Sequence, residues 1–227
     1  MDPGLYIAAQ GMLVEQNRQD QYANDLANAS TPGYKSDRTT QADFGSLLLS
    51  NTSTGQPLGS IATGLRVSAV TTDMTPAGVN PTGQPLDFAV QGNGFFAVQT
   101  PQGVRYTRDG QFGASASGLL VDKLGNAVLS QTGAPISVKA NGTVPAASLG
   151  VFNVTGATKQ GNNLFAGTAA GQGAGSVVSG ALEASSVDPV HTMVDMIASL
   201  RAYESGQKMI SSIDETMQQS AQSVGAL

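Results

Sequence analysis

The chain lacks cysteine and tryptophan, and it has one histidine and few charged side chains. Without cysteine it can form no disulfide and offers no thiolate nucleophile or metal ligand. Its 11 Lys and Arg residues form no cluster and are outnumbered by 16 Asp and Glu residues. This distribution gives no electrostatic footprint for binding nucleic acid. The 12% share of charged residues is about half of the usual share, which fits either a loop-rich β domain or a surface covered by partners.

Long hydrophobic runs are absent as well. The first residues, MDPGLY, show neither the basic region nor the apolar stretch of a secretory signal peptide. No stretch has the apolar length of a transmembrane helix. We therefore expect no cleaved signal peptide and no transmembrane segment, and export, if it occurs, by another route. The 227 residues suffice for one large domain or two small ones.

Side chains with catalytic potential are sparse and poorly placed. His191 falls in the first turn of a predicted helix, with Asp188 and Asp195 as its nearest possible metal-ligand partners. A histidine on a helix surface is the more common case, and Asp109, like other Asp residues here, belongs in a turn. We expect no catalytic residue, no metal site, no cofactor and no small-molecule substrate. The sequence therefore predicts a protein that is not an enzyme.

One glycine motif has to be distinguished from a nucleotide site. Residues 92–97, GNGFFA, match the dinucleotide-binding pattern G-x-G-x-x-G/A. That pattern requires a helix directly after the glycines, so that its first amides face a pyrophosphate. Here FFAVQT continues as a predicted strand. We interpret Asn93 and Gly94 as a hairpin turn between two strands.

Two long amphipathic helices are predicted at the ends of the chain. Both begin with Asp-Pro, a good N-cap followed by a favourable first helical residue, and they cover about residues 2–29 and 188–224. Apolar residues recur at near-heptad spacing in both, with polar interruptions. These narrow seams predict a coiled-coil-like pairing and contacts with other molecules. The residues expected at the assembly interface are Leu5, Met12, Tyr22, Leu26 and Asn28 in the first helix and Met193, Ile197, Leu200, Tyr203, Ile210, Ile213 and Met217 in the second.

Between the helices the chain has β character. Pro32 and Gly33 end the first helix, and a positive φ is expected at Gly33. No period is sustained after that turn until short alternating runs begin near residue 65. Asn93-Gly94 and Asp109-Gly110 are predicted hairpin signals, and residues 169–175 resemble a flexible linker. The repeated turns favour a small sandwich or irregular barrel.

We therefore predict an α+β fold, with paired terminal helices and a central all-β domain of short antiparallel strands. The predicted division has a helical domain made of residues 1–30 and 185–227. Residues 31–64 form an extended arm, and residues 65–184 form a β-rich outer domain.

Three separated blocks resemble the rod, hook and hook-associated axial proteins of the bacterial flagellum. The first is LANASTPGYK at residues 26–35, which includes Pro32 and Gly33. The second comprises LDFAVQGNGFFAV at residues 86–98 and YTRDGQF at residues 106–112. The third comprises LEASSVD at residues 182–188 and, within the last helix, MVDMI and RAYE. The resemblance covers the whole chain. The central block is similar to those of both proximal and distal rod members.

This resemblance implies a structural subunit of the basal-body rod. Family members pair their terminal helices in an inner tube, carry the β domain outside it and stack helically around a channel. The implied partners are copies of the chain, other rod and hook proteins, and the flagellar export apparatus. The implied location is the basal body, periplasmic in a cell with two membranes. The alternatives are a hook or other axial component, an envelope-binding or adhesion module, and a glycan hydrolase, which needs a carboxylate pair.

Overall fold

The computed structural model describes residues 3–43, 45–50, 56–62 and 64–224. Two compact units share the chain. We call residues 1–26, 37–71 and 189–227 the helical unit, and residues 27–36 and 72–188 the β unit. The chain therefore passes between the two units four times. No helix in the described part of the chain is long and apolar enough to span a membrane.

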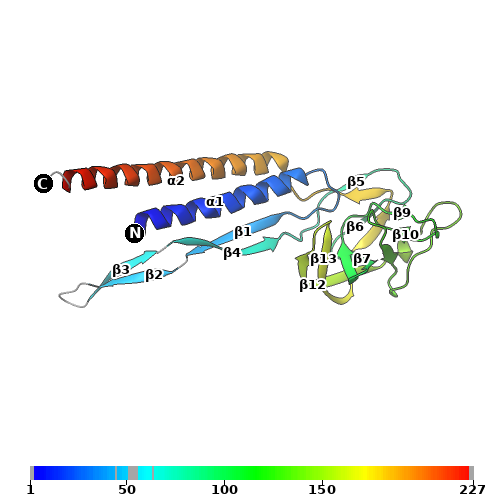
Figure 1. Ribbon diagram of the computed structural model, residues 1–227. Coiled ribbons are helices and arrows are strands. Elements are labelled where there is room, and N and C mark those ends of the chain that lie inside the picture. The colour runs from blue at the N-terminus through cyan, green and yellow to red at the C-terminus, as the bar shows by residue number, and fades with distance from the viewer. Residues whose placement is uncertain (1–2, 44, 51–55, 63, 225–227) are drawn as a thin grey trace. The chain divides into compact units, whose positions relative to one another are not determined.

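The two predicted terminal helices are confirmed. Helix α1 covers Pro3–Ala27 and helix α2 covers Pro189–Val224, so both begin at the proline of an Asp-Pro pair. Asp2, the predicted first N-cap, lies outside the described residues. The helices run side by side in opposite directions (Figure 1), and the hydroxyl of Ser199 in α2 donates to the backbone oxygen of Glu15 in α1 at 3.1 Å. A supercoil between them stays a prediction.

A β ribbon accompanies the helices within the helical unit. Strand β1 (Asp37–Asp43) pairs with β4 (Leu65–Thr72), and β2 (Ser46–Ser50) pairs with β3 (Pro57–Ala62). The Gln21 side chain of α1 donates to the backbone oxygen of Asp37 and accepts from the Thr39 hydroxyl. These strands lie largely where the sequence shows no sustained period. Pairing between backbones requires no alternation of apolar side chains where neither face of a ribbon covers a large core.

The β unit is built on a seven-stranded antiparallel sheet in the order β12-β13-β8-β7-β11-β10-β9. Strand β12 also pairs with β7, which closes a ring of four strands. The core of the unit is therefore a small irregular barrel, one of the two architectures that the turn spacing favoured. The strands are β7 (Phe95–Thr100), β8 (Gly103–Thr107), β9 (Gly113–Ala114), β10 (Leu120–Val121), β11 (Ala127–Leu129), β12 (Val151–Lys159) and β13 (Leu164–Gln172).

Two further strand pairs and a short helix complete this unit. Strand β6 (Phe88–Gln91) pairs with β14 (Ser176–Ser179), and β5 (Val79–Pro81) pairs with β15 (Ala181–Glu183). A 3-10 helix, η1, covers Ala146–Ser148. Strand β15 is the last β element before the chain leaves the β unit and enters α2.

Strand β7 separates two apolar clusters. Phe96 and Val98 point into the larger cluster, which also contains Phe88 and Phe112. Phe95 and Ala97 point into a smaller cluster with Tyr106, Phe165 and other residues. Because both faces of β7 are covered, its sequence is a nearly continuous apolar run and not an alternating one. This double burial makes β7 the centre of the β unit.

Neither predicted hairpin signal closes a hairpin. Strands β6 and β7, on the two sides of Asn93 and Gly94, belong to different sheets. The positive φ values fall at Gly92 and Gly94, at 97° and 136°, so the chain bends out of one sheet into the next instead of folding back. Asp109 and Gly110 likewise lie between β8 and β9, which do not pair with each other. A hairpin forms instead directly after Phe95–Thr100, where β7 pairs with β8 and Thr100 lies opposite Gly103.

The predicted flexible linker at residues 169–175 was also wrong over much of its length. Residues 169–172 belong to β13, where Ala169 pairs with Val154 and Gln172 pairs with Phe152. These four residues, Ala169, Ala170, Gly171 and Gln172, are exposed on the strand. The low complexity of the sequence indicated a linker. The backbone of this segment nevertheless pairs with β12, because hydrogen bonding between backbones does not depend on side-chain size.

Candidate functional site

The turn after α1 carries the first sequence block into the β unit. Gly33 has a φ of 66°, as predicted for this turn. A Cβ atom at this position would lie 2.3 Å from the backbone carbon of Arg108, so only glycine fits both the conformation and the space. The amide of Gly33 donates to the backbone oxygen of Glu183 at 2.9 Å. This close approach directs the side chain of Lys35 into the interior.

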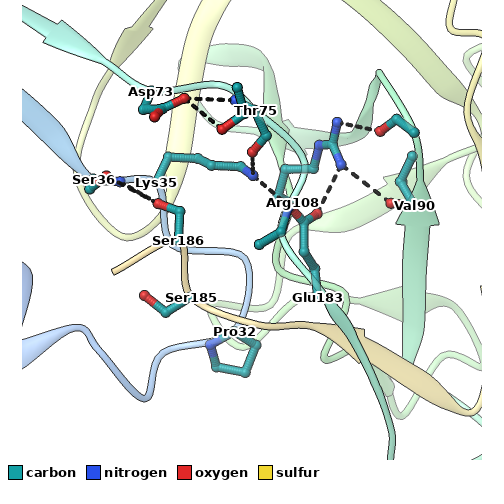
Figure 2. A network of polar contacts seen from close by, with 12 residues as sticks. Pro32, Lys35, Ser36, Asp73, Thr75, Val90, Arg108, Glu183, Ser185 and Ser186 are labelled. Atoms are coloured by element: carbon teal, nitrogen blue, oxygen red, sulfur yellow. Dashed lines mark hydrogen bonds and ion pairs between the residues drawn. The ribbon is translucent and has the colours of Figure 1, made fainter. Parts of the chain in front are cut away.

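Three charged side chains meet there, one from each sequence block (Figure 2). The Lys35 Nζ atom lies 2.6 Å from Glu183 Oε1, and Arg108 Nη1 lies 2.8 Å from Glu183 Oε2. Side-chain exposure is 0% for Lys35 and Glu183 and 1% for Arg108. We call Lys35, Arg108 and Glu183 the buried charge cluster. Charged groups are almost never buried so completely unless they are paired.

Backbone groups satisfy most of the remaining hydrogen-bonding capacity. Lys35 Nζ also donates to the Thr75 carbonyl at 2.6 Å. Arg108 donates to the Val90 carbonyl at 3.3 Å and to the Gly92 carbonyl at 2.8 Å. Glu183 Oε1 additionally accepts the Ala77 amide at 2.9 Å. The cluster is thereby bonded to two separate stretches of backbone, residues 75–77 and 90–92.

The charges in the cluster do not cancel. Two cations share one carboxylate, and the half-buried carboxylate of Asp73 adds a favourable field at Lys35. Burial lowers the pKa of Lys35 below its usual value of 10.5, and the positive charge of Arg108 acts in the same direction, while Glu183 and Asp73 oppose the shift. Desolvation is the largest of these effects, because removing an ammonium group from water disfavours its charged form.

This arrangement holds backbone in place and is not built for chemistry. Both oxygens of Glu183 are occupied by donors, and the side chains of all three residues are shielded from solvent. A general acid or base has to reach a substrate proton, which a fully bonded, covered carboxylate cannot do. Within the described residues, no group of three or more His, Asp or Glu side chains could hold a metal ion.

Sequence reasoning did not identify this cluster. Its three members lie within the three blocks that carry the family resemblance, and each is a charged residue in a chain with few charges. The presence of one such charged residue in each block was the only signal in the sequence that could have indicated the cluster. Spacing could not pair them, because Lys35 and Glu183 are 148 positions apart.

The predicted interface residues of α2 divide between two faces of the helix. One row contains Tyr203, Ile210 and Ile213, which are half-buried. Ser199 and Gly206 belong to the same row and face α1: the Ser199 hydroxyl lies 2.8 Å from Glu15 Oε2, and a Cβ at position 206 would lie 2.7 Å from Met12 Cγ. The set of interface residues predicted from the sequence contains members of this row and of a second row on another face of α2.

The second row of α2 is exposed and apolar. Met193, Ile197 and Leu200 are 49%, 52% and 46% exposed, and the neighbouring Val190 and Val194 are more exposed still. We call these five residues the outer apolar row. Met217, also predicted at the interface, is 43% exposed near the other end of α2.

The predicted residues of the first helix are half-buried. This holds for Leu5, Met12, Tyr22 and Leu26 in α1, and for Asn28 in the turn that follows it. Asn28 accepts two hydrogen bonds from Thr31, through its backbone oxygen at 3.0 Å and its side-chain oxygen at 3.2 Å. Asn28 thus shapes the turn. A role of these residues in contacts between molecules stays a prediction.

Family models match three regions of the chain. The model described as "Flagella basal body rod protein" matches residues 5–35. "Flagellar hook protein FlgE/F/G D1 domain" matches residues 89–155, and "Flagellar basal body rod FlgEFG protein C-terminal" matches residues 178–223. The three members of the buried charge cluster each fall in a different one of these matches.

Curated relatives match over nearly their full length. The flagellar basal-body rod protein FlgF of Escherichia coli is 32% identical, with 95% of each chain covered. FlgF of Caulobacter vibrioides is 30% identical, with 100% of each chain covered. The flagellar basal-body rod protein FlgG of Buchnera aphidicola is 29% identical, covering 98% of this chain and 100% of the relative.

Proposed function

Since this chain belongs to the family of flagellar basal-body rod proteins, we propose that it is a structural subunit of the rod. In this role it assembles with copies of itself and with other rod or hook proteins. Its relatives are named as rod proteins over almost the whole length of the chain. The role is mechanical: the subunits form the hollow shaft that transmits torque, and exported subunits pass through it.

The outer apolar row of α2 is the observation that supports assembly most directly. Its five residues recur at helical spacing, and they lie on a side of α2 other than the one that faces Glu15 and Met12 of α1. Scattered apolar side chains are common on protein surfaces, but a contiguous exposed row indicates an interaction site. Covering such a row in water contributes about 25 cal/mol for each Å² of apolar surface removed.

The rod requires contacts that repeat without closing on themselves. When a surface on one copy binds a different surface on the next, the result is a helical filament unless the rotation closes a ring. The outer row of α2 and the exposed apolar residues Tyr6 and Leu13 of α1 supply different surfaces on the same helical unit. We infer that neighbouring subunits use these helix faces, and that the shaft encloses a channel.

The same proposal covers export and location. The subunit leaves the cytoplasm through the flagellar export apparatus without a cleaved signal peptide, and it resides in the basal body, in the periplasm of a cell with two membranes. The relatives named as basal-body rod proteins support this location.

A charge placed in the outer apolar row tests the proposal. We expect Leu200→Asp to abolish assembly, because the new carboxylate would be buried without a partner. Ser205→Asp is the matched control, since it adds the same charge to the same helix at an exposed position five residues further along. Analytical ultracentrifugation and electron microscopy of each protein, alone and with other rod proteins, measure the outcome, and motility of a complemented strain gives a second reading.

Leu200→Asp should keep the circular-dichroism melting curve of the parent and remain monomeric, while Ser205→Asp should assemble. If Leu200→Asp formed tubes as the parent does, the outer row would not be the contact surface. A parent protein that stayed monomeric with every other rod protein present would contradict the rod assignment itself.

A further inference from the structure

The four chain passages between the units pose a structural problem. They follow residues 26, 36, 71 and 188, so the β unit must hold three stretches of chain that lead to the helical unit. These stretches are residues 27–36, the segment that begins at residue 72, and the segment that ends at residue 188. If they were held loosely, the three stretches would not keep a single arrangement within the β unit.

Backbone hydrogen bonds join the three stretches to one another. The Asp73 amide donates to the Ser36 carbonyl at 2.9 Å, and the Ser186 amide donates to the Tyr34 carbonyl at 3.0 Å. The Ser36 amide donates to the Ser186 hydroxyl at 2.8 Å. Each stretch is therefore bonded to at least one other within the β unit, close to the point where the chain leaves it.

We propose that the buried charge cluster is a positioning clamp for these chain passages. Lys35 contributes the first stretch and donates to the carbonyl of Thr75 in the second. Glu183 belongs to the strand that leads into the third, and its carboxylate receives Lys35 and the Ala77 amide on the same oxygen. One ammonium and one carboxylate thus connect all three stretches.

Arg108 attaches the clamp to the rest of the β unit. It binds the second oxygen of Glu183 at 2.8 Å, and its other bonds reach the carbonyls of Val90 at the end of β6 and Gly92 just beyond it. Its guanidinium lies 5.0 Å from the centre of the Phe95 ring in β7. The strands of the core therefore hold Arg108, Arg108 holds Glu183, and Glu183 holds Lys35.

The presence of charged residues in this cluster indicates that it positions the backbone and does not serve stability alone. Replacing a buried ion cluster by well-packed apolar residues is often neutral or stabilising. Apolar contacts, however, are not directional, whereas hydrogen bonds from an ammonium and a guanidinium select one arrangement of the bonded backbone. The clamp accordingly fixes one arrangement of the three stretches within the β unit.

A hairpin turn covers the same segment from another side. Between β12 and β13, Asn163 has a φ of 57° and its side chain donates to the Pro32 carbonyl at 3.1 Å. The Lys159 ammonium of β12 lies 4.3 Å from the centre of the Tyr34 ring. The turn at residues 31–36 is therefore held by the hairpin as well as by the cluster.

Hydrogen exchange of the monomer tests the clamp. We choose Lys35→Met, because it leaves the Arg108–Glu183 pair and hence the sheet intact, and Lys123→Met as a matched control. Lys123 is 54% exposed in a surface ion pair with Asp109. The amides to follow are those of Gly33, Ser36, Asp73 and Ser186, with the amides of β7 and β8 as the internal reference.

For Lys35→Met we expect exchange at the four clamp amides to accelerate about tenfold or more, with the reference amides unchanged. Lys123→Met should alter neither set. Ser186→Ala, which removes one bond of the clamp without touching a charge, should accelerate the Ser36 amide alone. Unchanged clamp amides in Lys35→Met, or equal acceleration in β7 and β8, would overturn the proposal. Because the protein is measured as a monomer, the result does not depend on the rod assignment.

Discussion

Glu183 is the residue on which the buried charge cluster depends. Its single carboxylate pairs with two cations, each within 2.8 Å of one of its oxygens. Removal of Lys35 would leave one cation paired with one carboxylate, whereas removal of the Glu183 charge would leave two buried cations facing each other. The three members of the cluster are therefore not equivalent.

We predict that Glu183→Gln destabilises the protein by about 3–5 kcal/mol, the range for leaving a buried charge uncompensated. Lys35→Met should cost less, about 1–3 kcal/mol, chiefly because the Thr75 carbonyl loses its donor. Denaturant unfolding followed by the fluorescence of the tyrosines measures both free energies. The opposite ranking would show that the Lys35 bond outweighs the charge balance.

Single residues were predictable only where the cause is local. A positive φ at Gly33 follows from the Pro-Gly sequence and is confirmed at 66°. The burial of Lys35 has no local cause, because it depends on Arg108 and Glu183, which approach from distant parts of the chain. Sequence spacing contains no information about such a meeting.

Among the elements, the helices were predicted best. Asp-Pro starts and sustained near-heptad spacing placed α1 and α2 to within two residues of their observed ends. For α2 the apolar pattern nevertheless did not separate two faces of the helix. Leu200 and Ile213 are both apolar, but Leu200 is exposed and Ile213 is half-buried. The hairpins failed for a different reason: Asn93-Gly94 indicates a bend, but it does not determine which sheet receives the next strand.

The contact between α1 and α2 provides a prediction at this scale. A Cβ at position 206 would lie 2.7 Å from Met12 Cγ, so the side chain in Gly206→Leu would separate the helices. We expect a loss of about 1–3 kcal/mol from overpacking, despite a gain of roughly 0.8 kcal/mol in helix propensity. Ser205→Leu, exposed and one residue away, is the control and should not destabilise. Thermal unfolding followed by far-UV circular dichroism distinguishes the two, and an equal response would mean that the helices do not pack closely at Gly206.

For the whole molecule, the family resemblance and the α+β architecture were both accessible from the sequence. The composition already indicated a protein with few charges, and three blocks spread along the chain identified the family. The division of the chain was harder to foresee. Strand β4, assigned from the sequence to the outer β domain, pairs with β1 in the helical unit, and pairing between distant strands is not visible in local patterns.

The two units should differ in stability in the free monomer. Apolar side chains along α2 are exposed, whereas the β unit has two closed apolar clusters. Helices gain most of their stability from tertiary packing. We therefore predict that amides in residues 8–27 and 193–217 exchange faster than those of β7 in the monomer and become protected on assembly. Hydrogen exchange before and after assembly measures this, and slow exchange of both helices in the monomer would contradict it.

The gathering of the chain passages at one clamp has an evolutionary consequence. Turns elsewhere in the β unit, such as those at Gly125, Gly133 and Gly142, have open space around them and take no part in the clamp. Lengthening such a turn carries only a small entropic cost. Extra modules inserted there would enlarge the β unit without altering the clamp. A single design could in this way give rise to axial subunits of different sizes that still share one helical plan.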